Sequence, residues 1–284
     1  AYWLEATLYN SLDRVAKVLV NGLHQRGYFT PGAKIGLAGY DSPPYQRTIK
    51  NSLVPALTRH GLKIADQVLI KPTANFNDAV SQQQPVTNAV LRFQTQGITH
   101  VIFFEHYGGI VFSFTTAGTA QKYYPRYGFS GNSSHACVCA DQATPYDELD
   151  RTWGSAVHVG WNMYNDVYKN PEVVGPNDAQ KQCDVLVKNA GNVPGYGGGW
   201  GVYCDAYFML AMAAKAAGTL DLQAIIRSYS KLSGYVPTGL VGPIEYPTGR
   251  RDGVATGRFV SYDKSKHYFT YASNPFPMST LLGP

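Results

Sequence analysis

The chain has 284 residues, of which 44% are hydrophobic and 15% are charged, and its formal net charge is +5. This composition is ordinary for a globular protein of about two domain-sized units with a sizeable core. The small net charge and the scattered Lys and Arg residues argue against nucleic acid as a partner. No window approaches the roughly 18 apolar residues that a bilayer-spanning helix needs.

The first half of the sequence alternates helical and strand patterns. Apolar residues recur at helical spacing over residues 2–26, which predicts a helix there. Short apolar runs then predict strands over 34–39, 62–70, 101–104 and 127–130. The segments between them predict helices over 45–60, 78–96 and 109–121. Strand–helix units of about 30 residues indicate a parallel sheet with right-handed crossovers and helices on both faces.

The second half has a different pattern. Helices are predicted over 177–189, 205–217 and 220–232, and residues 192–201 form a glycine-rich loop. Strands are predicted over 238–246 and 256–262, joined by a turn around 249–253. Residues 268–271 are expected to add a strand to this pair.

The four cysteines are Cys137, Cys139, Cys183 and Cys204. An even number is compatible with two disulfides and an oxidising compartment, and four cysteines allow three pairings. We favour Cys183–Cys204, because the turn-rich segment between them can bring its ends together. A cluster of His135, Cys137 and Cys139 lacks the second ligand pair of a zinc finger, and free buried thiols are a third possibility.

The order of these elements resembles one family. The strands and helices over 34–104 resemble the second lobe of type I periplasmic binding proteins. Asp205-Ala206-Tyr207 and the alanine-rich helix that follows resemble the helix after this family's lobe crossing. The run over 238–246, then Gly249 and residues 258–262, resembles its crossover and final hairpin.

This resemblance implies an α/β protein with parallel-sheet, three-layer α/β/α lobes. One lobe is essentially complete and the other is partial. Residues 1–167 would form the second lobe, 168–240 the helical part of the first lobe, and 241–284 the crossover strands that return to the second lobe. Such proteins hold a small polar organic molecule, such as an amino acid or an amide, in a cleft that closes by a hinge. The implied partners are this ligand and the membrane permease of an ABC transporter. The implied location is extracellular, periplasmic or on the cell surface as a lipoprotein. No cofactor is implied.

The chain departs from this family at its start, where members open with strands of the first lobe. The helices over 205–217 and 220–232 would need the sheet of that lobe to cover their apolar faces. Without it they would expose a large apolar patch. We therefore expect an N-terminal segment of the first lobe on the same or another chain.

Candidate ligand contacts follow the strands, because ligands of parallel sheets bind beyond the carboxyl ends. After the first strand these are Tyr40, Asp41 and Tyr45, although an Asp before Ser-Pro-Pro also suits an ordinary loop start. After the third strand they are Glu105, His106 and Tyr107, where a buried carboxylate beside a histidine would bind an ammonium group. The alternative there is a solvated loop or a local pair.

Further candidates lie in the fourth loop and beside the glycine-rich loop. Ser130 and Asn132 follow the fourth strand, while Tyr203 and Asp205 border the glycine-rich loop, where core packing is the alternative role. Residues 128–132 approach a hydrolase nucleophile elbow, but Asn132 stands where that motif has glycine.

The sequence is compatible with three classes of function. Solute binding for transport predicts a polar and aromatic cleft without a nucleophile–base pair. A sensor domain of the same fold would need a membrane anchor or signalling domain. A hydrolase is disfavoured, because HExxH, P-loop and GxSxG motifs are absent from the sequence. Solute binding is therefore the function that we expect.

Overall fold

A computed structural model describes most of the chain. The described residues are 11–72, 83–105, 108–130, 156–158, 177–191, 200–232, 234–238, 243–246, 253, 255–263, 265 and 268–283.

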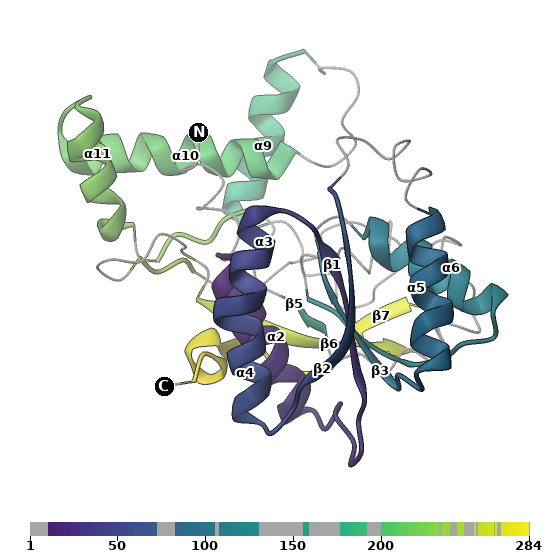
Figure 1. Cartoon of the computed structure of the whole chain (residues 1–284). Coiled ribbons are helices and arrows are strands. Elements are labelled where there is room, and N and C mark those ends of the chain that lie inside the picture. Colours follow the sequence, from purple (N-terminus) through teal and green to yellow (C-terminus); the bar gives the residue numbers. More distant parts are fainter. Residues whose placement is uncertain are drawn as a thin grey trace.

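The first half folds into alternating helices and strands, as predicted (Figure 1). The helices are α2 (Leu12–Gln25), α3 (Pro43–Thr48), η1 (Ile49–Leu53), α4 (Val54–Arg59), α5 (Gln83–Thr95) and α6 (Gly109–Ala120). The strands are β1 (Ile35–Tyr40), β2 (Ile64–Ile70), β3 (His100–Phe104) and β4 (Arg126–Gly128). The fourth strand ends two residues earlier than predicted. The predicted helical positions 2–10 and 78–82 lie outside the described residues.

The four strands form one parallel sheet in the order β2-β1-β3-β4. The chain therefore leaves β1 toward β2 on one side and returns to place β3 on the other. This arrangement confirms the parallel α/β sheet predicted from the sequence.

Two apolar cores sandwich this sheet, because successive side chains of a strand point to opposite faces. The core beneath α2, η1 and α4 contains Leu37, Ile102 and Phe104. The core beneath α5 and α6 contains Ala38, Val101 and Phe103. The same two layers of helices flank the sheet in Figure 1. The result is the predicted three-layer α/β/α arrangement.

A single helix was predicted over 45–60, and the structure has a continuous helical segment over 43–59 that contains a π-helical turn. In that turn the Val54 N–H donates to the Ile49 carbonyl, five residues earlier. Pro55 follows directly and has no N–H to donate, so the regular ladder is interrupted at this point. The π-helical turn packs against α2, and both Thr48 and Ser52 are buried.

The strands β1 and β3 approach each other closely near their carboxyl ends. A Cβ atom at Gly39 would lie 2.8 Å from the carbonyl oxygen of Phe104. The obstacle is backbone, so it cannot move away as a flexible side chain would. Glycine at position 39 is thus a packing requirement of this pair of strands.

Replacing Gly39 by Ala should therefore destabilise the protein by about 1–3 kcal/mol, the usual cost of overpacking a core. Urea unfolding of the intact protein measures the change. Gly109→Ala is the matched control, because a Cβ there has no heavy atom within 4 Å among the described residues. The control should change stability by less than about 1 kcal/mol. Equal stability of the two variants would contradict this account of β1 and β3.

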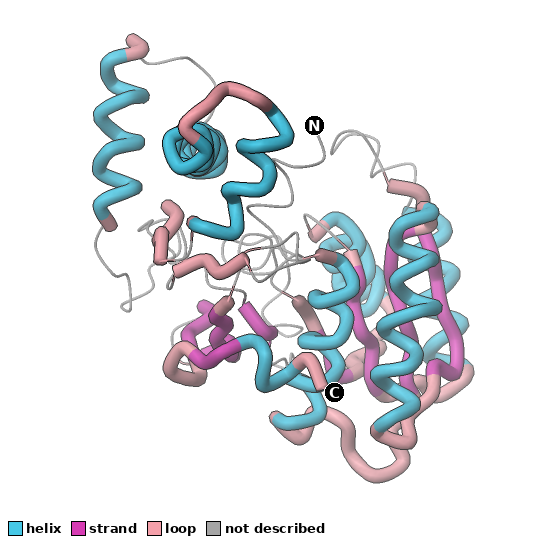
Figure 2. Tube along the Cα trace, turned by 90° about the vertical axis from the view of Figure 1, so that its left-hand side faces the viewer, coloured by secondary structure: helices cyan, strands magenta, loops and turns pink. Residues whose placement is uncertain are grey.

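The second half supplies a group of helices that lies beyond the sheet, on the side where α3 begins (Figures 1 and 2). They are α9 (Asp178–Asn189), α10 (Trp200–Ala217), α11 (Leu222–Ser228) and η5 (Tyr229–Lys231). Trp200 and Gly201 are helical, so α10 begins inside the segment that was predicted to be a glycine-rich loop.

A disulfide joins Cys183 of α9 to Cys204 of α10. The pairing favoured from the sequence is thus confirmed. Cys137 and Cys139 lie outside the described residues. The disulfide ties together two helices whose connecting segment contains the glycine-rich sequence.

The second sheet contains β5 (Ala156–His158), β6 (Thr256–Asp263), β7 (Tyr268–Tyr271) and β8 (Phe276–Pro277). β6 pairs antiparallel with each of the other three. The predicted pairing of residues 256–262 with residues 268–271 is confirmed by β6 and β7, whereas β5 was not predicted. The predicted strand over 238–246 is wrong for the described residues of that run, where Ile244 is an isolated bridge residue. The Ile244 N–H donates to the Tyr235 carbonyl, and the Glu245 N–H donates to the Gly253 carbonyl.

Within the described residues, no single helix is both long and apolar enough to cross a membrane. The α10 and α11 segments reach the required length and apolarity only as a pair, and they are bent by 102° relative to each other.

Candidate functional site

The carboxyl ends of β1 and β3 form the candidate site. Gly39 and Phe104 are in register between these neighbouring strands, so Tyr40 and Glu105 are the next residues at the same edge. The chain leaves β1 and β3 in opposite directions across the sheet, which makes this edge a topological switch point. Open parallel sheets bind ligands at such points.

Aromatic rings line the β1 side of this edge. The ring of Tyr40 meets that of Tyr45 edge to face, with centroids 5.2 Å apart, and Tyr45 meets Phe104 at 5.3 Å. Tyr40 and Tyr45 are both half-buried. The structure thus brings together two of the predicted contacts, and their rings give the edge a flat apolar surface with polar tips.

Asp41 continues the β1–β2 pairing by one residue. Its backbone N–H donates to the Ile70 carbonyl at 2.7 Å, and its carboxylate accepts a hydrogen bond from the Gln46 side chain. The hydrogen bond to Ile70 fixes the backbone of Asp41. The residue is only half-buried, so it retains access to solvent. A carboxylate in this position can accept further hydrogen bonds from an ammonium or hydroxyl group.

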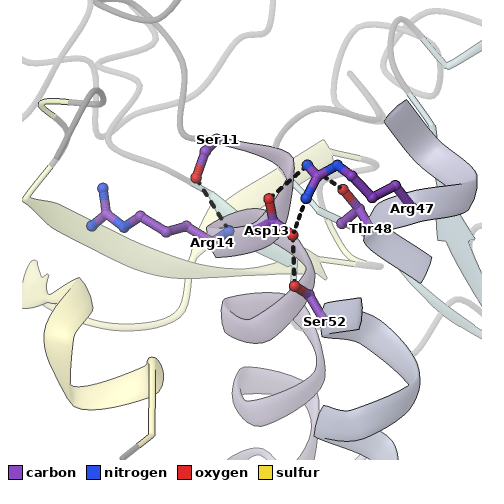
Figure 3. A network of polar contacts seen from close by, with 6 residues as sticks. All are labelled: Ser11, Asp13, Arg14, Arg47, Thr48 and Ser52. Carbon is purple, nitrogen blue, oxygen red and sulfur yellow. Dashed lines mark hydrogen bonds and ion pairs between the residues drawn. The ribbon is translucent and has the colours of Figure 1, made fainter. Parts of the chain in front are cut away.

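The helix that follows Asp41 is held in place by α2 (Figure 3). Arg47 of α3 pairs with Asp13 of α2 at 2.7 Å, and the Ser52 hydroxyl donates to the other Asp13 oxygen at 2.7 Å. Partial burial disfavours the charge of Asp13, but hydrogen bonds from Arg47 and Ser52 outweigh it and lower the pKa of Asp13. This network orients α3 and the loop before it.

Glu105 is fully buried, with a 1% exposed side chain. Its two carboxyl oxygens accept hydrogen bonds from the Ile110 and Val111 N–H groups, each at 3.0 Å. These N–H groups belong to the first turn of α6, so Glu105 closes the amino end of that helix. Burial raises the pKa of Glu105 to about 8, against the opposing effect of these two hydrogen bonds.

Glu105 should therefore make stability depend on pH. Above pH 4.5 the carboxyl ionises in the unfolded chain, while the folded carboxyl keeps its proton up to about pH 8. The folded state thus loses stability as pH rises through this window, by at most about 1.4 kcal/mol per pH unit. Above the folded pKa the loss levels off.

Glu105→Gln removes this ionisation and should flatten the pH dependence, even though Gln cannot accept both hydrogen bonds. Urea unfolding of both proteins at pH 5, 6.5 and 8 measures the effect. The difference between the two curves removes contributions from groups that are common to both. Parallel curves would show that Glu105 ionises normally.

The remaining candidates after β3 and β4 are only partly described. Ser130 is buried, and its hydroxyl forms no hydrogen bond with the described residues. His106, Tyr107 and Asn132 lie outside the described residues, so their roles stay predictions.

Two candidates lie on α10, away from the sheet edge. Tyr203 is 61% exposed, whereas Asp205 is buried. The Asp205 carboxylate accepts hydrogen bonds from the Tyr235 hydroxyl and from both the N–H and the hydroxyl of Thr238. Nearby, the Asn177 side chain donates to the Pro237 carbonyl. In the structure Asp205 therefore holds the segment that leads into the predicted crossover.

Neither the hydrogen bonds of Asp205 nor the Asp13–Arg47–Ser52 network was predicted from the sequence. Both connect residues that are more than thirty positions apart. Only weak signals in the sequence pointed to these contacts. They are Pro55 inside a helical pattern and Asn177 immediately before the α9 helix.

No protein-family model and no curated protein matches this sequence. Solved structures do match it. A branched-chain amino acid ABC transporter protein from Thermus thermophilus, solved with bound valine, is 15% identical with a TM-score of 0.64. The match covers 98% of this chain and 67% of that chain.

Two further matches have similar extents. A solute-binding protein of an ABC transporter from Rhodopseudomonas palustris BisB5, in complex with 3,4-dihydroxybenzoic acid, is 15% identical with a TM-score of 0.59. It is matched over 94% of this chain and 65% of its own. A type 1 periplasmic binding protein from Bordetella pertussis Tohama I is 13% identical with a TM-score of 0.57, over 94% and 65% of the two chains.

The chain therefore has the type I periplasmic-binding-protein fold that the order of its elements predicts, and it spans about two thirds of the length of these solved structures.

Proposed function

We propose that the intact protein captures a small polar organic molecule, such as an amino acid, an amide or a related acid, and delivers it to an ABC-type importer. The observation that carries this proposal is the switch point between β1 and β3, where Tyr40, Asp41 and Tyr45 gather at the carboxyl edge of the sheet. Valine and 3,4-dihydroxybenzoic acid, bound to two proteins of the same fold, support this size and polarity of ligand.

In this proposal the ligand lies between two lobes. Residues 1–167 and 241–284 form the second lobe, which is supported by the pairing of β5 with β6. Residues 168–240 belong to the first lobe, and Asp205 anchors the connection between them. His106, Tyr107, Ser130 and Asn132 are proposed contacts from the loops after β3 and β4, and Tyr203 is a proposed contact from the first lobe. A protein that delivers a ligand to an importer needs a permease as its partner and lies outside the cytoplasmic membrane. The Cys183–Cys204 disulfide supports such an oxidising compartment.

Binding rather than catalysis is the second part of the proposal. Proteins of the same fold that were matched above are a transporter component and two binding proteins. A ligand recovered unchanged after long incubation with the intact protein supports binding. Its turnover would favour the hydrolase reading instead, and a sensor role would require a signalling partner rather than a permease.

Asp41→Asn should weaken ligand binding by about 10–100-fold, the usual cost of a hydrogen bond to a charged group. A thermal-shift screen of the intact protein against amino acids, amides, sugars and aromatic acids first identifies the ligand class. Calorimetry then compares the variant with the parent.

Asp178→Asn is the matched control, because Asp178 is an almost fully exposed carboxylate on α9. It should leave the affinity unchanged. Unchanged affinity in Asp41→Asn as well would move the ligand away from the β1 edge. Glu105→Ala is less informative, because Glu105 is buried against α6 and its removal also costs stability.

The exposed apolar residues of α10 carry a proposal about the first lobe. Tyr207 and Leu210 are three positions apart on this helix, at helical spacing, and are 62% and 42% exposed. A stripe of this kind is typical of a helix that packs on a sheet. We propose that a β-sheet belonging to the remainder of the first lobe covers it, since the solved structures of this fold are longer than this chain.

If this sheet exists, Leu210→Glu should destabilise the intact protein by about 2 kcal/mol or more, because it buries a charge. Lys215→Glu, on an exposed position of the same helix, should change stability by less than about 0.5 kcal/mol. Urea unfolding measures both variants. Equal and small effects would mean that the α10 stripe is solvent-exposed in the intact protein.

A further inference from the structure

Two histidine rings stack on each other at the end of the sheet opposite the candidate site. His24 lies in the last turn of α2, and His60 is the residue that ends α4. Their ring centroids are 3.8 Å apart, with an angle of 14° between the ring planes. His24 is exposed and His60 is half-buried. This face-to-face contact brings two ionisable rings together from separate helices.

Hydrogen bonds connect this pair to the C-terminal segment. His60 Nε2 lies 2.8 Å from the Asn21 side-chain oxygen, and the Asn21 side-chain nitrogen donates to the Leu281 carbonyl at 2.5 Å. Because that asparagine oxygen only accepts, the network assigns a proton to His60 Nε2. The stacked pair therefore positions the side chain that holds Leu281 on α2.

Leu281 belongs to the short helix η6 (Met278–Leu281). Met278 is fully buried in a core that also contains Val18 of α2, Met209 of α10 and Phe259 of β6. The position of η6 thus affects how the α2 face packs against the elements of the second half. A change at the histidine pair would reach this shared core through Asn21.

The surroundings of the pair are cationic. Burial lowers the pKa of His60 and has the largest effect. The neighbouring charges of His24 and Arg59 lower this pKa further. The other charged residues between positions 15 and 27 are Lys17 of α2 and Arg26, which directly follows α2. The Arg26 guanidinium lies over the Phe259 ring. Residues 278–283 carry no ionisable side chain.

We propose that the His24–His60 stack is an acid-sensitive latch for η6. With at most one ring protonated, the rings stay stacked and His60 keeps its hydrogen bond to Asn21. When both rings are protonated, two like charges face each other at contact distance beside Arg59, and the rings separate. His60 then leaves Asn21, and η6 is held less firmly on α2. This inference does not depend on the proposed ligand.

The test is amide hydrogen exchange of residues 278–282 in the intact protein at pH 7.5 and pH 5, corrected for the intrinsic pH dependence of exchange. The latch predicts that exchange at pH 5 is faster by about tenfold, the factor that corresponds to one pKa unit. His24→Gln removes one of the two charges and keeps His60 beside Asn21. Its exchange should differ by less than about twofold between the two pH values.

Two further measurements separate the latch from general acid sensitivity. Asn21→Ala breaks the link, so its exchange should be fast at both pH values. NMR titration of the ring protons should show a higher His60 pKa in His24→Gln than in the parent protein. An unchanged His60 pKa would overturn the proposal. So would equal exchange of the parent at both pH values, or the full pH effect in His24→Gln.

Discussion

A Cβ atom at residue 39 would lie 2.8 Å from the carbonyl oxygen of Phe104, so the close approach of β1 and β3 at this point favours glycine. The two central strands are in register up to this contact, with Gly39 opposite Phe104. The register in turn sets Tyr40 and Asp41 beside Glu105, at the point where the chain diverges to the two sides of the sheet. The proposed site depends on this backbone contact more than on any single side-chain interaction.

The two loops at this edge are stabilised in different ways. Beside β1, Asp41 is tied to the end of β2, and α3 is tied to α2 by the Asp13–Arg47 pair. Beside β3, a buried carboxyl group closes the first turn of α6. The first arrangement leaves a carboxylate accessible, and the second uses a carboxyl internally. This contrast is why Asp41 is a stronger ligand candidate than Glu105 in our account.

The order of strands and helices in the first half was predictable, because apolar periodicity and the glycine stops are local signals. The Cys183–Cys204 pairing was also anticipated. The start of α10 was missed, because the glycines before it suggested a loop that continues through residue 201. The described residues of the run over 238–246 do not form the predicted strand, and Thr238 at its start bonds instead to Asp205, which lies thirty-three positions away. The inward orientation of Glu105 depends on helix α6 packing against β3, which no local pattern records.

The central claim is that a ligand contacts the loops after β1 and β3 together. Hydrogen exchange of the intact protein with and without its ligand tests this claim most directly. Our account predicts that the ligand protects amides in both 41–46 and 108–111, and leaves 30–34 and 96–99, at the opposite end of the sheet, unchanged. Protection confined to the opposite end, or absent from both loops, would contradict it.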